Sequence, residues 1–495
     1  MLYNSTRDNS VKVTSARAIN NGISAEGGLF VPEQLPKISA DELHALAEKP
    51  YVGRAAAVLK LFLSDFTDEE IADCVKGAYC GTFDNDEPAP LVAMPDGTHI
   101  LELWHGPTCA FKDMALQLLP HLLTRSSVKT GDGKKTMILV ATSGDTGKAA
   151  LEGFKDVDNT GIMVFYPEHG VSRTQKLQMA TQEGGNVFVC AINGNFDDAQ
   201  SGVKRIFTDP DIRERLSEKG IAFSSANSIN WGRLLPQIVY YVSVYCDLLN
   251  EKGEVGEFNV VVPTGNFGNI LAAYYAKCMG VPIGRLICAS NSNNVLTDFI
   301  KTGTYDRNRS FYTTISPSMD ILISSNLERL LYHLSGRDSE QTAAYMRSLA
   351  ESGRYTVSDS VREQVQSLFY GGCADDRATK ATIHDLFEKE HYLCDTHTAV
   401  AVSVYNDYVK ATGDRTPAVI VSTASPYKFA SDVLDAVEAG AAEGLSGIEA
   451  MERLSEKTGT KIPAPLSGLA DKKIRFEKVV EPADMDKAVF DCLGV

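Results

Sequence analysis

The sequence lacks the long apolar runs that mark a membrane span or a secretory signal. Its 495 residues contain no uninterrupted apolar run of about 18 residues, the length that a transmembrane helix needs. Residues 1–20 hold Ser, Thr and basic residues but no apolar core. Asp8 and the missing leucine face argue against a transit peptide. We therefore expect a cytoplasmic protein without a membrane segment.

Cysteine and histidine are present, but without the spacing of a metal site. The ten cysteines include no C-x-x-C pair, and His391 and His397 do not have the i, i+4 spacing of two ligands on one helix. Disulfide ladders are typical of short secreted chains rather than of one this long. We therefore expect reduced, mostly buried thiols and no metal ion.

Positive charge is in deficit. Lys and Arg total 48 against 64 Asp and Glu, which gives a formal net charge of −16. No basic cluster interrupts this excess, so the long-range field repels nucleic acids and anionic membranes. A small anionic ligand remains compatible with it, because backbone N–H groups and a few cations can build a local pocket.

The composition is that of an ordinary globular protein, with 44% hydrophobic and 23% charged residues. Because one hydrophobic core rarely serves more than about 250–300 residues, the length predicts two or more domains. Helical patterns in DELHALAEK and DEEIADCVKGAY, closed by the turn-rich DNDEPAP, indicate a separate N-terminal unit. We find no internal repeat.

A pattern of apolar strand, polar loop and helix occurs three times after this unit. Residues 137–140 precede SGDTG, residues 258–262 precede PTGNFGN, and residues 418–421 precede STASP; each loop leads into a helical pattern. Such alternation predicts an α/β fold with a parallel sheet covered on both faces. Ligands of these sheets bind beyond the carboxyl ends of the strands, where all three loops fall.

The loops have the chemistry of anion sites, although each also has an ordinary interpretation as a turn. Glycines in PTGNFGN allow N–H groups to converge on a phosphate at a helix N-terminus, without a Walker A or G-x-G-x-x-G pattern. In TSGDTG, Asp145 disfavours a phosphate, so we expect contacts to a carboxylate or a hydroxyl. Lys148 is interpreted as a solvated lysine of the first helical turn. In STASP, Ser425 is expected to cap a helix that begins at Pro426.

The segment HGPTCAFKDMALQLLP predicts a helix that Thr108 caps and whose first turn holds Lys112, outside the apolar stripe. The helix dipole disfavours a cation at that position. Lys112 is therefore either an exposed lysine without a function or one with a lowered pKa, able to form a Schiff base.

Taken together, these segments resemble those of threonine synthases, in the family's order. The resemblance rests on HGPTCAFKD, TSGDTG, PTGNFGN, GNFDDAQ, SSANSINWGRLLPQ, DTHTAV and the opening YNSTRDNSVKVTSARAINNGISAEGGLFVP, and it covers nearly the whole chain. Ser425 stands where family members often have a histidine, and Cys109 where an aliphatic residue is common. The alternatives are another β- or γ-replacement enzyme or a dehydratase on the same fold, or a metabolite-binding protein that has kept the fold.

The resemblance implies a two-domain pyridoxal-phosphate enzyme of fold type II, similar to the tryptophan synthase β subunit, with an extra N-terminal unit. The implied domains are residues 1–95, a large domain of residues 96–132 and 210–495, and a small domain of residues 133–209. Lys112 would form the Schiff base with pyridoxal 5'-phosphate, and Thr423 would meet the pyridine nitrogen. The cofactor phosphate would be held by Gly265, Asn266, Phe267, Gly268 and Asn269.

The implied reaction turns O-phospho-L-homoserine and water into L-threonine and phosphate by γ-elimination and β-addition of water, the last step of threonine biosynthesis. We expect a monomer or homodimer. Substrate contacts are expected from Thr108, Ser143, Asp145, Thr146, Arg173 and Lys176. Residues 308–375 carry no motif that we can interpret, and an insertion that covers the site is one explanation for them.

Overall fold

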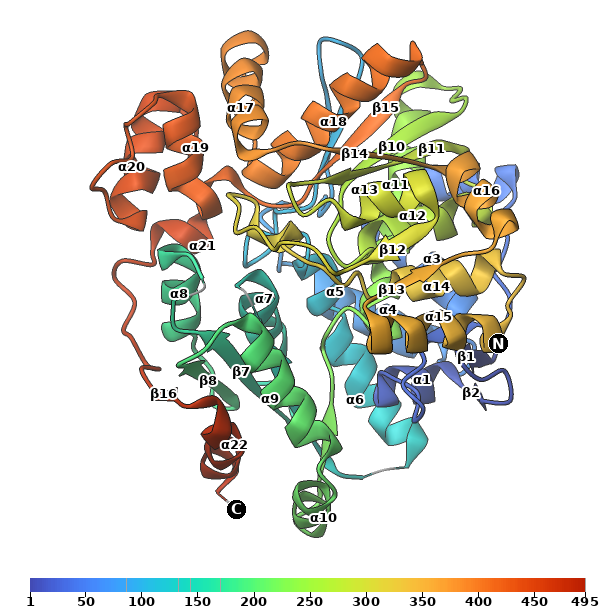
Figure 1. Cartoon of the computed structure of the whole chain (residues 1–495), viewed down its shortest axis with the longest axis vertical. Helices are drawn as coiled ribbons and strands as arrows, with labels where there is room; N and C mark the ends of the chain where they lie inside the picture. The colour runs from blue at the N-terminus through green and yellow to red at the C-terminus, as the bar shows by residue number, and fades with distance from the viewer. Residues whose placement is uncertain (86, 132, 143, 170, 495) are drawn as a thin grey trace.

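Two sheets, each with helices on both faces, organise most of the chain (Figure 1). The computed structural model describes residues 1–85, 87–131, 133–142, 144–169 and 171–494. The larger sheet has the order β14-β11-β10-β15-β5-β4 and is parallel except for the antiparallel pair of β4 and β5. Its strands are β4 (Leu91–Ala93), β5 (His99–Glu102), β10 (Phe258–Pro263), β11 (Ile283–Ser290), β14 (Phe369–Cys373) and β15 (Ala418–Ser422).

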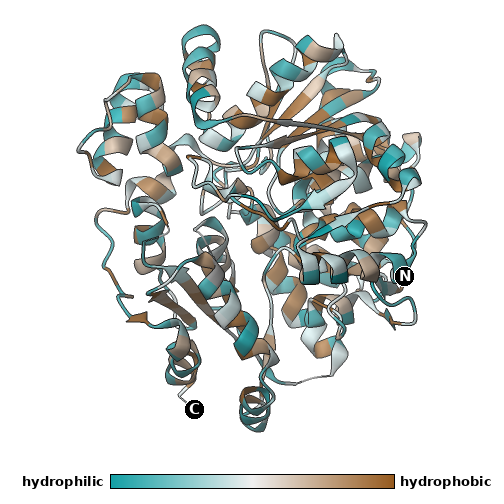
Figure 2. Ribbon diagram, viewed as in Figure 1, coloured by the Kyte–Doolittle hydropathy of each residue, from teal (hydrophilic) through white to brown (hydrophobic). Residues whose placement is uncertain are grey.

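The larger sheet is buried on both faces, which explains why its strands are apolar without alternation. In β10, Val260 and Val262 belong to the core beneath α11 (Trp231–Lys252) and α12 (Gly268–Met279). Val261 points the other way, into a smaller core that it shares with α18 (Thr396–Thr412). Figure 2 shows the same organisation as brown strands beneath partly teal helices.

The second sheet is fully parallel, with the order β16-β8-β7-β6-β9. It reaches beyond residues 133–209, because β9 and the C-terminal β16 pair at its two edges. Its strands are β6 (Lys135–Ala141), β7 (Thr160–Pro167), β8 (Val187–Ile192), β9 (Ile221–Ser224) and β16 (Val479–Val480). Its helices are α7 (Asp145–Phe154), α8 (Arg173–Ala180), α9 (Phe196–Thr208), α10 (Pro210–Glu218) and α22 (Met485–Leu493).

The N-terminal unit packs against the larger sheet's helices through α2 and α3, which contact α11. Capping boxes begin two of its helices: Ser39 with Glu42, and Thr67 with Glu70. The unit contains β1 (Tyr3–Ser5), β2 (Lys12–Val13), α1 (Ser15–Asn21), β3 (Phe30–Pro32), α2 (Ala40–Ala47), α3 (Tyr51–Phe62) and α4 (Asp68–Tyr79).

Two further groups of elements lie in the second half of the chain. The first follows β12 (Thr304–Asp306) and contains η1 (Pro317–Met319), α14 (Leu327–Leu334), α15 (Ser339–Ser352), β13 (Arg354–Thr356) and α16 (Asp359–Leu368). The second, at the left of Figure 1, contains η2 (Pro426–Phe429), α19 (Ala430–Val437), α20 (Gly447–Thr458) and α21 (Ala464–Ser467). Within the described residues, no helix is both long and apolar enough to span a bilayer.

The predicted pattern of strand, loop and helix is confirmed at all three places. SGDTG joins β6 to α7, PTGNFGN joins β10 to α12, and STASP joins β15 to η2 and α19. Ser425 also caps η2 as expected, because its hydroxyl accepts a hydrogen bond from the Tyr427 N–H. The carboxyl ends of β10 and β15 thus lie side by side at one edge of the larger sheet.

Candidate active site

Lys112 lies at the carboxyl edge of the larger sheet, at the start of the short helix α5 (Asp113–Leu116). Its loop runs along the end of β15: Phe111 N–H donates to the Thr423 carbonyl at 2.8 Å, and Ser425 N–H donates to the Cys109 carbonyl at 3.0 Å. Cys109 adopts a left-handed backbone with φ 57°, a costly conformation for a residue with a Cβ. The loop is therefore held beside Thr423 rather than continuing as a regular helix.

The environment of Lys112 favours a neutral amine. Its side chain is only 11% exposed. Burial lowers the pKa of Lys112 to about 8, and the positive charges of Lys428 and Arg233 act in the same direction, against the carboxylates of Asp145 and Asp113. Of the two interpretations of Lys112, the structure favours a reactive lysine over an exposed one without a function.

Asp145 is the carboxylate nearest to Lys112. Its Oδ2 lies 3.7 Å from Lys112 Nζ, and its Oδ1 lies 2.8 Å from Nζ of the fully buried Lys428. Gln175 Nε2 donates to Oδ1 at 2.9 Å, and Ser318 Oγ donates to Oδ2 at 3.3 Å. Burial alone would raise the pKa of Asp145, but the two lysines outweigh it and hold that pKa well below its usual range.

Thr108 does not cap a helix, which corrects the prediction. Its backbone N–H and its hydroxyl donate to the Asp113 carboxylate at 2.8 and 2.6 Å, so the helix begins later, at Asp113. Burial raises the pKa of Asp113 to about 6, against the effect of these two hydrogen bonds. Because the Thr108 hydroxyl already donates to Asp113 and the side chain is fully buried, it has no free donor for a ligand.

The glycine loop after β10 has its backbone donors free. No described residue accepts a hydrogen bond from the N–H groups of Gly265, Asn266 or Phe267. Phe267 has φ 62° and stands at the N-terminus of α12, where the helix dipole favours an anion. The arrangement is that of the predicted phosphate cradle.

The residues around η1 cover this loop and bind its carbonyl groups. Ser324 Oγ donates to the Gly265 carbonyl at 2.7 Å, and Asn326 Nδ2 donates to the Asn266 carbonyl at 3.0 Å. A Cβ on Gly265 would lie 2.6 Å from the Ser318 carbonyl oxygen, so this close approach requires glycine. The segment without an interpretable motif therefore does contribute to the site.

An unpartnered buried donor also lies at the loop. Asn269 is 7% exposed, and its Oδ1 accepts hydrogen bonds from the hydroxyls of Tyr240, at 2.8 Å, and Tyr241. Its Nδ2 is buried and has no partner among the described residues, which is costly unless a ligand accepts from it. A phosphate oxygen would satisfy this donor and the free N–H groups, so these residues fit pyridoxal phosphate.

A histidine that was not predicted as a site residue holds η1 in place. Asp395 accepts a hydrogen bond from His397 Nδ1 at 2.7 Å, and His397 Nε2 accepts one from the Ser318 N–H at 3.1 Å. The second bond leaves the ring proton on Nδ1, which fixes a neutral tautomer. DTHTAV was recognised as a family segment, but only the fold brings it to Ser318.

The other residues of TSGDTG have different surroundings. Lys148 is buried rather than solvated, which corrects the prediction: its Nζ donates to Glu152 at 2.8 Å and to Gln182. Thr146 is half-buried in the first turn of α7. Ser143 lies outside the described residues.

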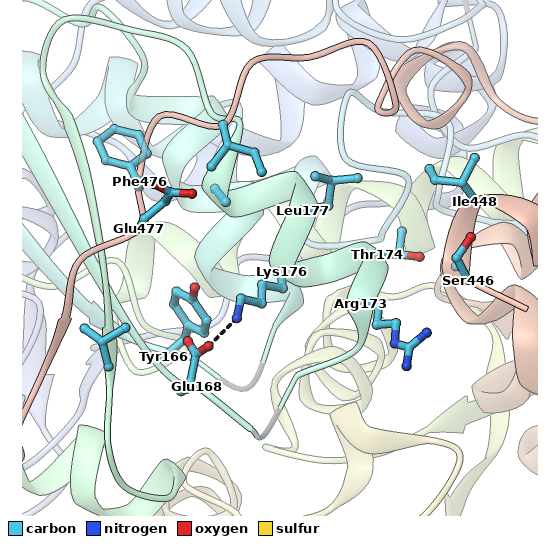
Figure 3. Close-up of a pocket in the computed structure, with 14 residues that line it drawn as sticks. Tyr166, Glu168, Arg173, Thr174, Lys176, Leu177, Ser446, Ile448, Phe476 and Glu477 are labelled. Carbon is cyan, nitrogen blue, oxygen red and sulfur yellow. Dashed lines mark hydrogen bonds and ion pairs between the residues drawn. The ribbon is translucent and has the colours of Figure 1, made fainter. Parts of the chain in front are cut away.

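Arg173 and Lys176 line a cavity of about 510 Å³ between α8, the start of α20 and residues 474–479 (Figure 3). Lys176 forms an ion pair with Glu168, whereas Arg173 has no partner among the described residues. Neither Lys112 nor the glycine loop is among the described residues that line this cavity. The expected contact of Arg173 and Lys176 with substrate stays a prediction.

Arg233 is a buried cation that was not predicted as a site residue. It is 3% exposed and donates to the Ala226 carbonyl, and its Nε has no partner in the part of the chain that the structure describes. It forms no ion pair with a described carboxylate, and burial lowers its pKa to about 10. Its charge also lowers the pKa of Lys112. A buried guanidinium without a counter-ion is suited to binding an anion.

Comparison with known proteins covers most of the chain. Family models match at residues 2–79 (threonine synthase N terminus), 87–360 (pyridoxal-phosphate dependent enzyme) and 398–489 (threonine synthase, C-terminal). A threonine synthase of Pseudomonas aeruginosa is 38% identical over 430 residues, which cover 87% of this chain and 89% of that protein. The chain belongs to the threonine synthase family.

Solved structures extend the match to the whole fold. Threonine synthase from Brucella melitensis, with pyridoxal phosphate bound, has 36% identity and a TM-score of 0.87, with 99% of each chain covered. The yeast enzyme has 32% identity and a TM-score of 0.88. These comparisons confirm the predicted fold and pyridoxal phosphate as the cofactor.

Another relative differs in length and in name. Human threonine synthase-like 1 is 41% identical over 437 residues, which cover 86% of this chain but only 58% of the human protein. Membership in the family therefore leaves open which reaction this chain performs.

Among the described residues, we find no cluster of three or more side chains that could hold a metal ion.

Proposed function

We propose that the protein converts O-phospho-L-homoserine and water into L-threonine and phosphate. The observation that carries this proposal is the Lys112 amine, whose pKa burial lowers to about 8, in a site with free backbone donors and in a chain of the threonine synthase family. Lys112 Nζ would bind the cofactor aldehyde, and the glycine loop with Asn269 would bind its phosphate. The hydroxyl of Thr423, a buried residue whose carbonyl accepts from the Phe111 N–H, would face the ring nitrogen.

Pyridoxal phosphate, when bound, supplies the electron sink that stabilises negative charge next to the substrate amine. Lys112 Nζ, displaced by that amine, would then take the proton from the substrate Cα and later return it. At pH 7 an ordinary lysine is about 0.03% unprotonated, whereas a pKa of about 8 leaves roughly a tenth of the amine neutral. The gain of roughly 300-fold in free base supports this role.

The substrate is a dianionic phosphate ester with a carboxylate, so it needs cations and donors beyond those that hold the cofactor. Arg233 is the best-supported candidate, because its guanidinium is buried, close enough to affect Lys112, and unpaired with any described carboxylate. The covering residues around Ser318 would keep water from reaching the site freely. The cytoplasmic location and the monomeric or dimeric state stay predictions.

The proposal is tested by incubating the purified holoenzyme with O-phospho-L-homoserine and measuring phosphate and threonine in the same samples. We expect equal amounts of the two products from the wild type and neither from Lys112→Ala. Phosphate without threonine would assign an elimination instead. No turnover by a protein whose cofactor absorbance depends on Lys112 would refute the proposed substrate.

A further inference from the structure

One carboxylate is shared by two buried lysines in this site. Asp145 Oδ1 lies 2.8 Å from Lys428 Nζ, and Asp145 Oδ2 lies 3.7 Å from Lys112 Nζ. The exposed fractions of the three side chains are 3% for Asp145, 0% for Lys428 and 11% for Lys112. The proposed mechanism uses Lys112, and nothing so far accounts for Lys428.

The charges do not balance if both amines are protonated. Asp145 is the one described carboxylate within 4 Å of either amine; it neutralises one ammonium group, and a second buried ammonium without a close counter-ion is costly. Asp145 itself stays ionised, because the two lysines hold its pKa well below the usual range despite its burial. One of the two lysines must therefore give up its proton more readily than an exposed lysine would.

Hydrogen bonds decide which lysine keeps the proton. Lys428 Nζ donates to Asp145 and also to the Thr108 carbonyl, at 2.9 Å. Lys112 Nζ is 3.7 Å from Asp145 Oδ2, too far for a good hydrogen bond, and it hydrogen-bonds to no described residue; the ring of Phe111 lies 4.8 Å away. The ammonium is better solvated at Lys428, so the neutral amine falls to Lys112.

We propose that Lys428 is a positioning residue for Lys112: by binding Asp145, it weakens the hold of that carboxylate on the Lys112 ammonium and leaves more of the amine free to react. This inference rests on the proposed function in one respect: that function is what requires an unprotonated amine at Lys112. A carboxylate next to Lys112 would by itself hold that amine protonated. Because Lys428 already binds this carboxylate, Asp145 is only a weak counter-ion for Lys112. The Lys112 amine lies near an Asp145 oxygen without forming a close ion pair with it.

The charged groups around the two amines are consistent with this division. Those that act on Lys112 are Asp145, Lys428, Arg233 and Asp113; Asp113 and the thiol of Cys109 also interact with Lys428. Burial raises the pKa of Cys109 to about 12, so it carries no charge at neutral pH. Two cations therefore oppose the protonation of Lys112, and one of them is Lys428.

The pair also joins the two halves of the site. Asp145 opens α7 on the second sheet, whereas Lys428 lies in η2, after the last strand of the larger sheet. A purely structural clasp and a positioning role therefore both predict some loss of stability when Lys428 is replaced. Only the positioning role predicts a change in the proton affinity of Lys112.

That proton affinity can be measured on the full chain after removal of the cofactor. Trace acetic anhydride labels each unprotonated lysine, and peptide mass spectrometry from about pH 6 to about pH 10 gives the midpoint for Lys112. Lys428→Met removes the charge and keeps the length of the side chain. We expect its Lys112 midpoint to rise by about one pH unit or more, so labelling at pH 7 falls about tenfold.

Asp145→Asn predicts the opposite shift, because the amine loses the one described carboxylate within 4 Å of it, and this variant keeps the inference testable should Lys428→Met not fold. Two controls accompany these variants: the labelling midpoint of Lys148, followed in the same samples, should not change in Lys428→Met, and the exposed-site variant Lys389→Met should leave the Lys112 midpoint unchanged. An unchanged midpoint in Lys428→Met, or shifts of the same sign in both variants, would overturn the inference. Since no turnover is measured, a wrong substrate would not affect the result.

Discussion

Replacing Gly265 by alanine tests whether the loop after β10 is the cofactor's phosphate cradle. The added Cβ would lie 2.6 Å from the Ser318 carbonyl oxygen, and ordinary contact begins at 3.4 Å, so one of the two must move by roughly 0.8 Å. The Ser318 side cannot yield easily, because its N–H is bound to His397 Nε2. The strain is therefore relieved mainly by displacing the loop and its free donors.

A displacement of this size removes at least one hydrogen bond to a charged phosphate oxygen, which is worth about 1.5–3 kcal/mol. We therefore expect Gly265→Ala to bind pyridoxal phosphate roughly 10- to 150-fold more weakly than the wild type. Titrating the stripped protein with the cofactor, followed by absorbance, measures this change. Gly256→Ala is the matched control, because a Cβ there meets nothing within 4 Å. Wild-type affinity in Gly265→Ala would refute the assignment of the cradle.

Three further changes test other parts of the site. The rate at which the cofactor-free protein captures pyridoxal phosphate should rise with pH, with a midpoint near 8, because only the neutral Lys112 amine attacks the aldehyde. Stopped-flow absorbance measures this rate, and a midpoint near 10.5 would contradict the lowered pKa of Lys112. Asn269→Ala removes a buried donor, so we expect about tenfold weaker cofactor binding by the same titration, and unchanged affinity would count against it. Thr423→Asp should hold the ring nitrogen protonated, changing the cofactor spectrum and increasing transamination; an unaltered spectrum and product profile would argue against the assigned position of Thr423.

Much of the fold could be predicted because its signals are local. Apolar residues 258–262 are continuous since β10 is buried on both faces, and the glycine loop that follows is legible as an anion site. The capping signal of Ser425 and Pro426 is confirmed at η2, whereas the cap predicted at Thr108 is absent because Thr108 donates to the Asp113 carboxylate instead. The edge strand of the second sheet could not be predicted from local sequence. β16 pairs with β8 from near the C-terminus, and its two residues carry no strand pattern.

The site itself was predicted where a motif carried it and missed where distant segments meet. Lys112 was identified as a lysine with two possible environments, and only the fold shows that Asp145 and Lys428 surround it. Lys148 was taken as solvated because helical periodicity says nothing of Glu152 and Gln182 at its amine. Burial and pairing of charged groups depend on long-range packing, which sequence spacing does not encode.

The central claim is that this chain breaks the Cγ–O bond of O-phospho-L-homoserine and adds water at Cβ. The most direct measurement is turnover of that substrate by the holoenzyme in ¹⁸O-labelled water, with both products analysed by mass spectrometry. The account predicts equal amounts of the two products, with the label in the threonine hydroxyl and none in the phosphate, and no turnover by Lys112→Ala. Label in the phosphate, or phosphate without threonine, would contradict it.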